Sequence, residues 1–372
     1  MKVRIGDLTK IRTGKLDANA ASMDGQYPFF TCSKEPLRIS TYSYDCECVL
    51  VAGNGDLNVK YYNGKFDAYQ RTYIIENNNV EKLYLPYLYC FLETYIKELR
   101  KQAIGGVIKY IKICNLSDAV IELPSIEKQK KIVKILKTSK KCLDMRTTQM
   151  AFLDGLIKAR FVELFGDPRS NPYGFGKKLL RDTCKVVTGN TPSRSVEAYY
   201  GDYVEWIKTD NIVSGLLNPT KATESLSEEG MKVGRTVEKG SILMACIAGS
   251  IASIGRVCVT DRRVAFNQQI SAIVPEEYNI LFLYVLLQLS KEYLVEEINM
   301  ALKGILSKSK LEEKEFIVPP MELQEQFADF VHQVDKSKLL SLIKLLEQLI
   351  TYLYNIFIIY RQDKGEEVED HE

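Results

Sequence analysis

Side chains that can pair with base edges or hold phosphates occur in glycine-containing turns in two parts of the chain. Arg, Lys, Asn and Gln offer the donors and acceptors that read base pairs, while hydroxyls and backbone amides hold phosphates. Glycine lets the backbone approach a phosphate oxygen closely. The first candidate set is Arg12, Thr13, Gly14, Lys15, Gly53, Asn54, Lys60, Tyr61, Tyr62, Arg71 and Lys109. The second is Thr188, Gly189, Asn190, Thr191, Lys208, Asn211, Gly249, Ser250, Arg256, Asn267, Gln268, Gln269 and Lys308.

The residue patterns of common enzymes are missing from the sequence. A nucleophile with a general base needs a histidine near a Ser or Cys, yet both histidines, His332 and His371, lie near the C-terminus. Neither common glycine loop for nucleotide phosphates is present. Asn171-Pro172-Tyr173 partly resembles the tripeptide with which amino-methylating enzymes hold a flipped base, but its second proline is absent. We therefore expect no catalytic site in this chain.

The cysteines and histidines do not form a metal-binding pattern. Nine cysteines are scattered, and none has the C-x-x-C spacing of structural zinc sites. An odd cysteine number and the absence of a secretory signal predict a reducing, cytoplasmic location. The most apolar stretch, Ile280 to Leu289, is about half the length of a membrane span. We expect no cofactor, no metal and no membrane contact for this chain.

The charge balance gives no simple argument for a nucleic-acid partner. The formal net charge is only +2, so a DNA-binding face has to arise from local charge. The segment from Glu127 to Arg160 holds ten basic and three acidic residues, which suits a solvated face or a contact along a DNA backbone. Residues 362–372 are strongly acidic, and we expect a solvated, disordered tail.

The chain contains an internal repeat. Thr13-Gly14 is echoed by Thr188-Gly189, and the strand-like run ending at Gly53-Asn54-Gly55 is echoed by the run ending at Gly249-Ser250. Three further landmarks recur at a constant offset of 195, namely Leu116, Pro124 and Gln129 against Leu311, Pro319 and Gln324. The repeat predicts two related modules.

Each copy ends in a long segment with apolar residues every seven positions. These residues are Leu136, Leu143, Met150, Ile157 and Leu164 in the first copy, and Leu339, Leu346 and Leu353 in the second. A seven-residue period predicts a long helix with a coiled-coil seam, although two ordinary amphipathic core helices also fit it. We predict helices over 125–165 and 320–361, after modules 1–124 and 166–319.

Each module is predicted to have a mixed α/β composition. The expected strands include Tyr61-Tyr62, Arg71 to Ile75, Val204 to Ile207 and Gln269 to Val274. The expected helices are Pro86 to Lys101 and Leu281 to Met300. The predicted fold class is therefore α+β, with two α/β modules in tandem, each followed by a long helix.

Four ordered motifs make the sequence similar to the specificity subunit of Type I restriction-modification systems. The Pro-x-x-Glu-x-Gln helix starts at Pro124 and Pro319 are one motif. The others are the module openings Leu8 to Gly14 and Leu180 to Gly189, the run Val49 to Ala52 through Lys60 to Phe66, and Phe165-Gly166-Asp167-Pro168 through Asn171-Pro172. The resemblance covers essentially the whole chain.

The resemblance implies a non-catalytic subunit with two target-recognition domains. Each domain would read one half of an asymmetric bipartite site in double-stranded DNA, and the two helices would pack antiparallel as a coiled-coil ruler. Two methyltransferase subunits would bind the helices and methylate adenines, and restriction subunits would add cleavage. S-adenosylmethionine, ATP and Mg²⁺ would belong to those partners. A helix of about 40 residues is roughly 60 Å long, enough to hold two modules one DNA turn or more apart.

Two other functions remain open from the residues. A stand-alone nucleic-acid-modifying enzyme, such as a DNA methyltransferase, predicts that the isolated chain binds S-adenosylmethionine. A coiled-coil scaffold with no DNA role predicts that Arg71→Ala or Gln268→Ala leaves binding unchanged, whereas changes in the helix seam abolish it.

Overall fold

The computed structural model describes residues 1–296, 298 and 304–361, without the side chains of residues 355 and 357–361. The predicted acidic tail, 362–372, lies outside the described residues. The described chain forms two compact units: Met1–Met145 with the described residues from Lys344 on, and Arg146–Ile343. Each unit therefore contains one module and one part of each long helix. Two α/β modules and two long helices confirm the predicted fold class.

Module one is built on a curled six-stranded sheet. Its strand order is β2-β7-β5-β6-β3-β4, with bounds Thr9–Thr13, Thr72–Asn77, Tyr44–Ala52, Val59–Ala68, Tyr27–Phe30 and Leu37–Ile39. A bridge between Leu16 and Tyr69 brings the end of β6 back to the end of β2. The module also contains the strand pair β1 (Lys2–Arg4) with β8 (Val120–Glu122), the helices α1 (Leu85–Gln102) and α2 (Ile113–Ser117), and the 3-10 turns η1 (Ile5–Asp7) and η2 (Ala18–Ala20).

Strand β5 supplies the centre of the module-one core. Val49 and Val51 pack in a cluster with Leu88 of α1, whereas Cys48 and Leu50 pack on the other face in a cluster that includes Phe66. A strand with both faces covered is expected to be a continuous apolar run, because neither face meets water. The run from Cys48 to Ala52 is accordingly buried along its whole length.

The described residues of module two form two larger sheets and one two-stranded pair. The first has the order β10-β18-β15-β16, with bounds Cys184–Thr188, Ile270–Pro275, Ile242–Ala245 and Val257–Val259. The second has the order β11-β13-β12-β17-β14, with bounds Tyr200–Gly201, Ser225–Leu226, Val204–Ile207, Val264–Phe266 and Thr236–Val237. The other elements are β9 (Lys177–Leu179), β19 (Glu315–Ile317), α4 (Leu180–Thr183), α5 (Glu228–Val233), α6 (Ile280–Leu289), α7 (Lys291–Val295), α8 (Lys308–Glu312), η3 (Glu197–Tyr199), η4 (Thr209–Asn211) and η5 (Ile251–Ser253).

The sequence repeat corresponds to matching strands and hydrogen bonds. The order β2-β7-β5-β6 in module one matches β10-β18-β15-β16 in module two. The fully buried amides of Gln129 and Gln324 donate from Nε2 to the carbonyls of Pro124 and Pro319, both at 2.8 Å. Their Oε1 atoms accept from backbone amides that precede α1 and α6. Each glutamine thus ties a long helix to its module.

One part of the sequence alignment of the two copies was wrong. Gly53 donates to Arg71 O at 2.7 Å, and Cys246 makes the same bond to Gln269 O at 2.8 Å. The structural counterpart of Gly53 is therefore Cys246. Gly249 lies farther along, in the loop after β15. Aligning the two copies on their glycines failed because the two sheets share the same backbone hydrogen bonds at this position but not the same residue type.

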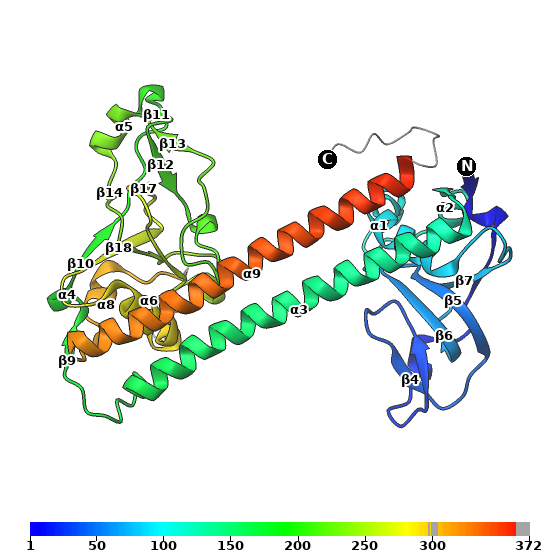
Figure 1. Cartoon of the computed structure of the whole chain (residues 1–372), viewed down its shortest axis with the longest axis horizontal. Helices are drawn as coiled ribbons and strands as arrows, with labels where there is room; N and C mark the ends of the chain where they lie inside the picture. Colours follow the sequence, from blue (N-terminus) through cyan, green and yellow to red (C-terminus); the bar gives the residue numbers. More distant parts are fainter. Residues whose placement is uncertain (297, 299–303, 362–372) are drawn as a thin grey trace. The chain divides into compact units, whose positions relative to one another are not determined.

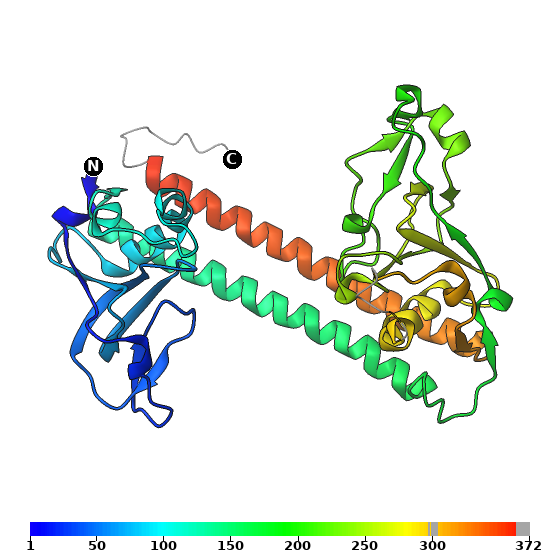
Figure 2. The ribbon, with the colours of Figure 1, turned by 180° about the vertical axis from the view of Figure 1, so that it is seen from behind.

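The long helices α3 (Ile126–Phe165) and α9 (Met321–Arg361) lie side by side (Figures 1 and 2). In unit one, Cys142 donates to Gln348 at 2.8 Å, and in unit two, Lys338 is 2.7 Å from Asp154. Residue numbers rise along one helix as they fall along the other, so the pair is antiparallel.

The predicted seam residues of α9 do not form the seam. Leu339, Leu346 and Leu353 are 59%, 59% and 67% exposed. The buried stripe of α9 is instead Phe327, Ala328, Val331, Val334, Ser341 and Leu345. The helix carries apolar residues on more than one face, and the heptad count selected an exposed face.

The predicted helix from Leu281 to Met300 is divided. Helix α6 ends at Leu289, and Ser290, with φ −89° and ψ 11°, separates it from α7. Met300 itself lies outside the described residues. No helix in the described ranges is long and apolar enough to cross a membrane. The same ranges contain no group of three or more His, Cys, Asp or Glu residues suited to holding a metal ion.

Candidate nucleic-acid interface

One end of the module-one sheet gathers four of the predicted residues. The chain segments are joined there by backbone bonds, from Gly53 to Arg71 O at 2.7 Å and from Gly55 to Lys109 O at 2.9 Å. The side chains of Lys15, Arg71 and Lys109 are exposed, and that of Asn54 is half-buried. Three cations beside an amide suit contacts to phosphates and base edges.

Other predicted residues of module one hold the fold together. The Arg12 guanidinium pairs with Glu76 at 2.8 Å and lies 4.6 Å from the centre of the Tyr44 ring. Tyr62 packs its ring against those of Phe30 and Phe66. Thr13 ends β2, and its carbonyl accepts a bond from the Tyr44 hydroxyl. These contacts account for Arg12, Tyr62 and Thr13 without a ligand.

Lys60 and Tyr61 lie on β6 with partners in their own module. Lys60 Nζ donates to Asn58 Oδ1, and burial lowers the pKa of this lysine. The Tyr61 hydroxyl donates to Glu47 at 2.5 Å, and burial together with this bond raises the pKa of the phenol. Both side chains are therefore engaged by partners within module one.

Internal packing explains three of the four predicted glycines. A methyl group at Gly14 would lie 2.2 Å from Ala68 O, and one at Gly189 would lie 2.2 Å from Asn267 O. At Gly53 the nearest atom would be Arg71 O, at 2.4 Å. Only at Gly249, of these four, is there open space around the added carbon. Gly14, Gly53 and Gly189 are therefore required because another backbone segment of the same module lies close to each of them. A bound phosphate is not needed to explain these glycines.

The equivalent end of the module-two sheet gathers Thr188 to Thr191 with Gln268 and Gln269. Asn190 N donates to Phe266 O at 3.1 Å, just as Lys15 N donates to Ala68 O at 3.2 Å. Thr191 and Gln268 are exposed and hydrogen-bonded to each other. The exposed loop residues Gly249 and Ser250 follow the end of β15, and Lys308 pairs with Glu312 within α8.

Three predicted residues of module two form hydrogen bonds with the backbone of their own module. Asn211 is 8% exposed and accepts from Lys208 N at 2.9 Å. Asn267 is 6% exposed and accepts from Gln269 N at 3.1 Å. Arg256 donates to the carbonyls of Ser253 and Thr209. Because these polar atoms are bonded to the backbone, they hold the loops in place.

The structure groups the predicted Lys208 with Arg194, two aromatic rings and a carboxylate, a grouping that the sequence did not predict. Arg194 lies 4.5 Å from the ring centre of Tyr200 and 5.0 Å from that of Trp206. Its Nη2 is 2.6 Å from Glu224 Oε2, and Lys208 Nζ donates to the other carboxylate oxygen. The hydrogen bond from Lys208, followed by that from Arg194, lowers the pKa of Glu224. Lys208 is among the residues predicted from the sequence, and Trp206 is the single tryptophan of the chain.

This cluster is continuous with the predicted loop. Trp206 Nε1 donates to Asn190 O at 3.3 Å. Asn190 Oδ1 accepts from Arg235 N at 2.8 Å, and Arg235 Nη1 donates to Thr188 O at 2.5 Å. The candidate interface of module two therefore extends from the end of β10 to strand β12 of the second sheet.

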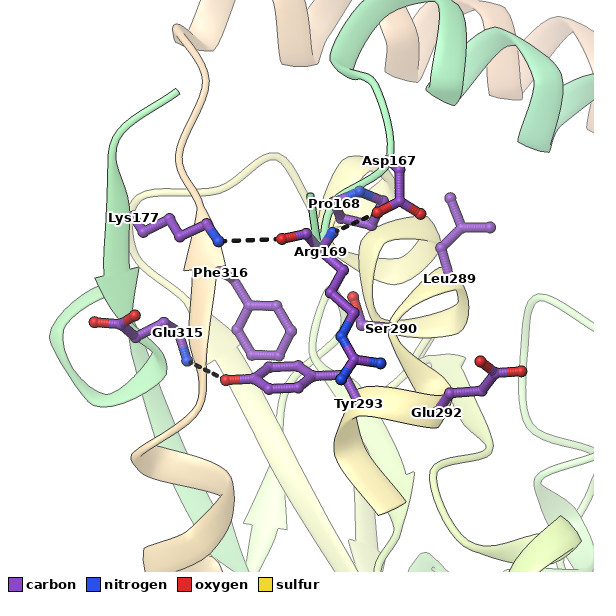
Figure 3. Close-up of a pocket in the computed structure, with 10 residues that line it drawn as sticks. All are labelled: Asp167, Pro168, Arg169, Lys177, Leu289, Ser290, Glu292, Tyr293, Glu315 and Phe316. Atoms are coloured by element: carbon purple, nitrogen blue, oxygen red, sulfur yellow. Dashed lines mark hydrogen bonds between the residues drawn. The ribbon is translucent and has the colours of Figure 1, made fainter. Parts of the chain in front are cut away.

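A cavity of about 170 Å³ lies beside the turn that follows α3, where module two begins (Figure 3). Its polar groups bond one another: Lys177 Nζ donates to Arg169 O at 3.3 Å, and Glu315 N donates to the Tyr293 hydroxyl at 3.3 Å. Asp167 accepts from the amides of Arg169 and Ser170, and these bonds lower the pKa of its carboxyl group. We assign this cavity a structural role, in fixing the turn after α3.

Known proteins resemble both modules. The family model for the Type I restriction modification DNA specificity domain matches residues 1–151 and 172–351. The specificity subunit of the Type I restriction enzyme EcoDI of Escherichia coli is 44% identical over 136 residues, which are 37% of this chain and 30% of that protein. The HindI specificity subunit of Haemophilus influenzae is 33% identical over 120 residues, 32% of this chain and 25% of that protein. Each match spans less than a third of the relative's own length.

Solved structures share the fold at low identity. The crystal structure of the Type-I restriction-modification system S subunit from M. genitalium has a TM-score of 0.65 and 16% identity, covering 96% of this chain and 95% of that one. A chain from work on complex assembly and conformational transition of the type I R-M system has a TM-score of 0.55 and 16% identity, covering 98% of each chain. Because the family model spans both modules and most of both long helices, this chain belongs to the Type I restriction modification DNA specificity domain family.

Proposed function

We propose that this chain recognises double-stranded DNA for a Type I restriction-modification system, each module contacting one half of an asymmetric bipartite target. In this proposal residues 1–124 and 166–319 are the two target-recognition domains, and 125–165 and 320–361 are the helices that set their spacing. The chain itself is non-catalytic.

One observation carries this proposal: equivalent backbone positions in the two modules hold different side chains, of types that can pair with base edges. Lys15 in module one corresponds to Asn190 in module two, because their amides donate to the last residues of β6 and β17, the strands that pair in parallel with β3 and β12. Arg71 corresponds to Gln269, because both carbonyls accept from the end of the central strand. Arginine pairs best with guanine and glutamine with adenine. Two modules with one scaffold and different side chains suit two different half-sites.

Exposed apolar residues on the helices suggest where protein partners bind. In unit one, Leu346, Ile350 and Leu353 are 59%, 65% and 67% exposed, and in unit two, Phe152 and Leu340 are 70% and 59% exposed. Apolar patches of this kind on a soluble protein mark interaction surfaces. One patch on each unit suits two methyltransferase subunits, which would bring S-adenosylmethionine. Restriction subunits would bring ATP and Mg²⁺, and the whole complex would act on DNA in the cytoplasm.

The test is to co-express the chain with the methyltransferase encoded beside it, in a host without adenine methylation. We expect the two proteins to co-purify and the host genome to carry methylated adenines in one bipartite motif. Omitting the chain should abolish the methylation. Binding of S-adenosylmethionine and methylation by the chain alone would contradict the proposal and support a stand-alone enzyme. Capture of the methyltransferase without any methylated motif would support a scaffold.

A further inference from the structure

The aromatic and charged cluster in module two holds one arginine in a fixed orientation. The Arg194 guanidinium lies in the angle between Tyr200 and Trp206, whose rings are 6.1 Å apart at 70°. Glu224 pairs with one end of the guanidinium at 2.6 Å. Trp206 is itself only 3% exposed and donates to the backbone of Asn190, so the rings are anchored in the module.

The arginine remains accessible although it is held. Its side chain is 56% exposed, and Glu224 occupies only part of a group that has five N–H donors. A guanidinium over an aromatic ring keeps N–H donors that can bond acceptors in other directions. A planar donor edge with a fixed direction can bond two acceptors at once.

Resting on the proposed function, we propose that Arg194 reads a guanine in the half-target of module two, with Glu224, Tyr200 and Trp206 as its positioning residues. Guanine presents O6 and N7 as paired acceptors in the major groove, and a bidentate arginine is their commonest partner. Asn190, which accepts from Trp206, is followed directly by Thr191, and Thr191 is hydrogen-bonded to Gln268. Thr191 and Gln268 would therefore contact base pairs next to the guanine.

A base contact fits this arrangement better than a phosphate contact. A carboxylate beside the arginine repels an approaching phosphate. Glu224 would therefore weaken a phosphate contact at this position. Guanine O6 and N7 carry no net charge, so the arginine can keep its pair with Glu224 and still donate to the base. Lys208, which shares the same carboxylate, completes the support and lies 5.1 Å from the Trp206 ring centre.

The experiment compares Arg194→Lys with the wild type, each in complex with the methyltransferase. The methylated motif gives the half-target of module two, and duplexes substituted at each of its positions give the discrimination against each wrong base. We expect Arg194→Lys to lose about 5- to 150-fold of the discrimination at one guanine, the equivalent of about 1–3 kcal/mol for a bidentate pair. Affinity for unrelated duplex should change less than about twofold, because the charge is retained.

Two further variants separate reading from structure. Glu224→Gln should reduce discrimination at the same guanine and raise the affinity for unrelated duplex, because the arginine loses its orientation and the surface loses a negative charge. Arg263→Lys is the matched control: Arg263 is also exposed and paired with a glutamate, Glu238 at 2.7 Å, but precedes β17 at its far end. It should leave the motif and the affinity unchanged.

The inference is overturned if the half-target of module two contains no G·C pair, or if Arg194→Lys leaves discrimination unchanged at every position. A uniform loss of affinity on all duplexes would also overturn it and would show a phosphate contact. Melting temperatures equal to that of the wild type would exclude unfolding as the cause. Failure of the wild-type complex to methylate any bipartite motif is a separate outcome, which refutes the proposed function itself.

Discussion

At the residue scale, Gly14 and Gly189 occupy the same crossing point in the two modules. An alanine methyl would lie 2.2 Å from a backbone carbonyl oxygen at either position, and backbone can move aside less easily than a side chain. We expect Gly14→Ala and Gly189→Ala each to cost about 1–3 kcal/mol, as overpacked cores do. Urea unfolding of the purified chain measures this loss. Gly249→Ala, with open space around the new carbon, should unfold like the wild type.

The buried glutamines provide a second residue-scale prediction. Gln324→Met keeps the size of the side chain but leaves Pro319 O and Asn279 N without their bonds to the amide. Each unsatisfied buried group costs about 1–3 kcal/mol, so we expect a clear loss in the free energy of unfolding. Gln326→Met, on the exposed side of the same helix, is the control and should change stability little. Equal effects of the two substitutions would contradict the role assigned to Gln324.

At the element scale, Glu205 and Arg262 connect β12 to the residue stretch before β17. Arg262 donates from Nε and Nη2 to the two carboxylate oxygens at 2.9 and 2.8 Å, and Ala222 N donates to the same carboxylate at 2.8 Å. The hydrogen bonds from Arg262, which outweigh the opposing effect of burial, lower the pKa of Glu205 below its usual 4.5. A lowered folded-state pKa contributes stability above pH 4.5, and this contribution is lost as the pH falls through the folded-state value.

We therefore expect Glu205→Gln to lower the urea midpoint at pH 7, by an amount that shrinks as the pH drops below 4.5. Urea unfolding curves of the wild type and Glu205→Gln, recorded at steps of about one pH unit between pH 3 and pH 7, would show the two midpoints converging at low pH. Glu238→Gln breaks the exposed pair with Arg263 and should cost only about 0–1 kcal/mol. A difference between Glu205→Gln and wild type that stays constant with pH would argue against the ion pair as its source.

The two faces of α9 should respond in opposite ways to the same substitution. Leu345 is 9% exposed and its neighbour Leu346 is 59% exposed. Leu345→Lys should lower the unfolding midpoint, because it puts a charge into the contact with α3. Leu346→Lys should leave the midpoint unchanged but weaken capture of the methyltransferase, measured by co-purification. If Leu346→Lys retains full capture, the exposed apolar patch of unit one is not the partner surface.

At the scale of the whole molecule, the repeat was the most informative feature of the sequence. The constant offset of Pro124 and Gln129 against Pro319 and Gln324 marked a helix junction that the fold uses twice. The length of the helices was also predictable, because helices of this length show their period in the sequence alone. The face that packs inward was not, because Leu339 and Leu346 form as regular a stripe as the buried residues.

The candidate interface was predictable only where it lies in glycine-containing turns. Lys15 and Arg71 lie far apart in sequence but come to the same end of the sheet because β2 and β7 are paired, a pairing that the sequence did not predict. Arg194, Trp206 and Glu224 have no common spacing, and they meet only through the pairing of β12 with β13 and the turns around it. The sequence predicted Asn211 and Asn267 as DNA contacts, yet in the folded loops their side-chain oxygens accept hydrogen bonds from the backbone.

The two modules should be exchangeable as readers. The main core of module one runs from Ile5 to Val133, and that of module two runs from Ile157 to Val334, so neither core takes residues from the other module. Replacing residues 1–124 with the same module of another family member should therefore change one half of the methylated motif and leave the other half and the spacer length unchanged. Replacing 166–319 should change the opposite half. Methylation mapping of both exchange proteins measures this outcome. A change in both halves from one exchange would mean that the modules read DNA jointly, and the independence of their cores would then not extend to recognition.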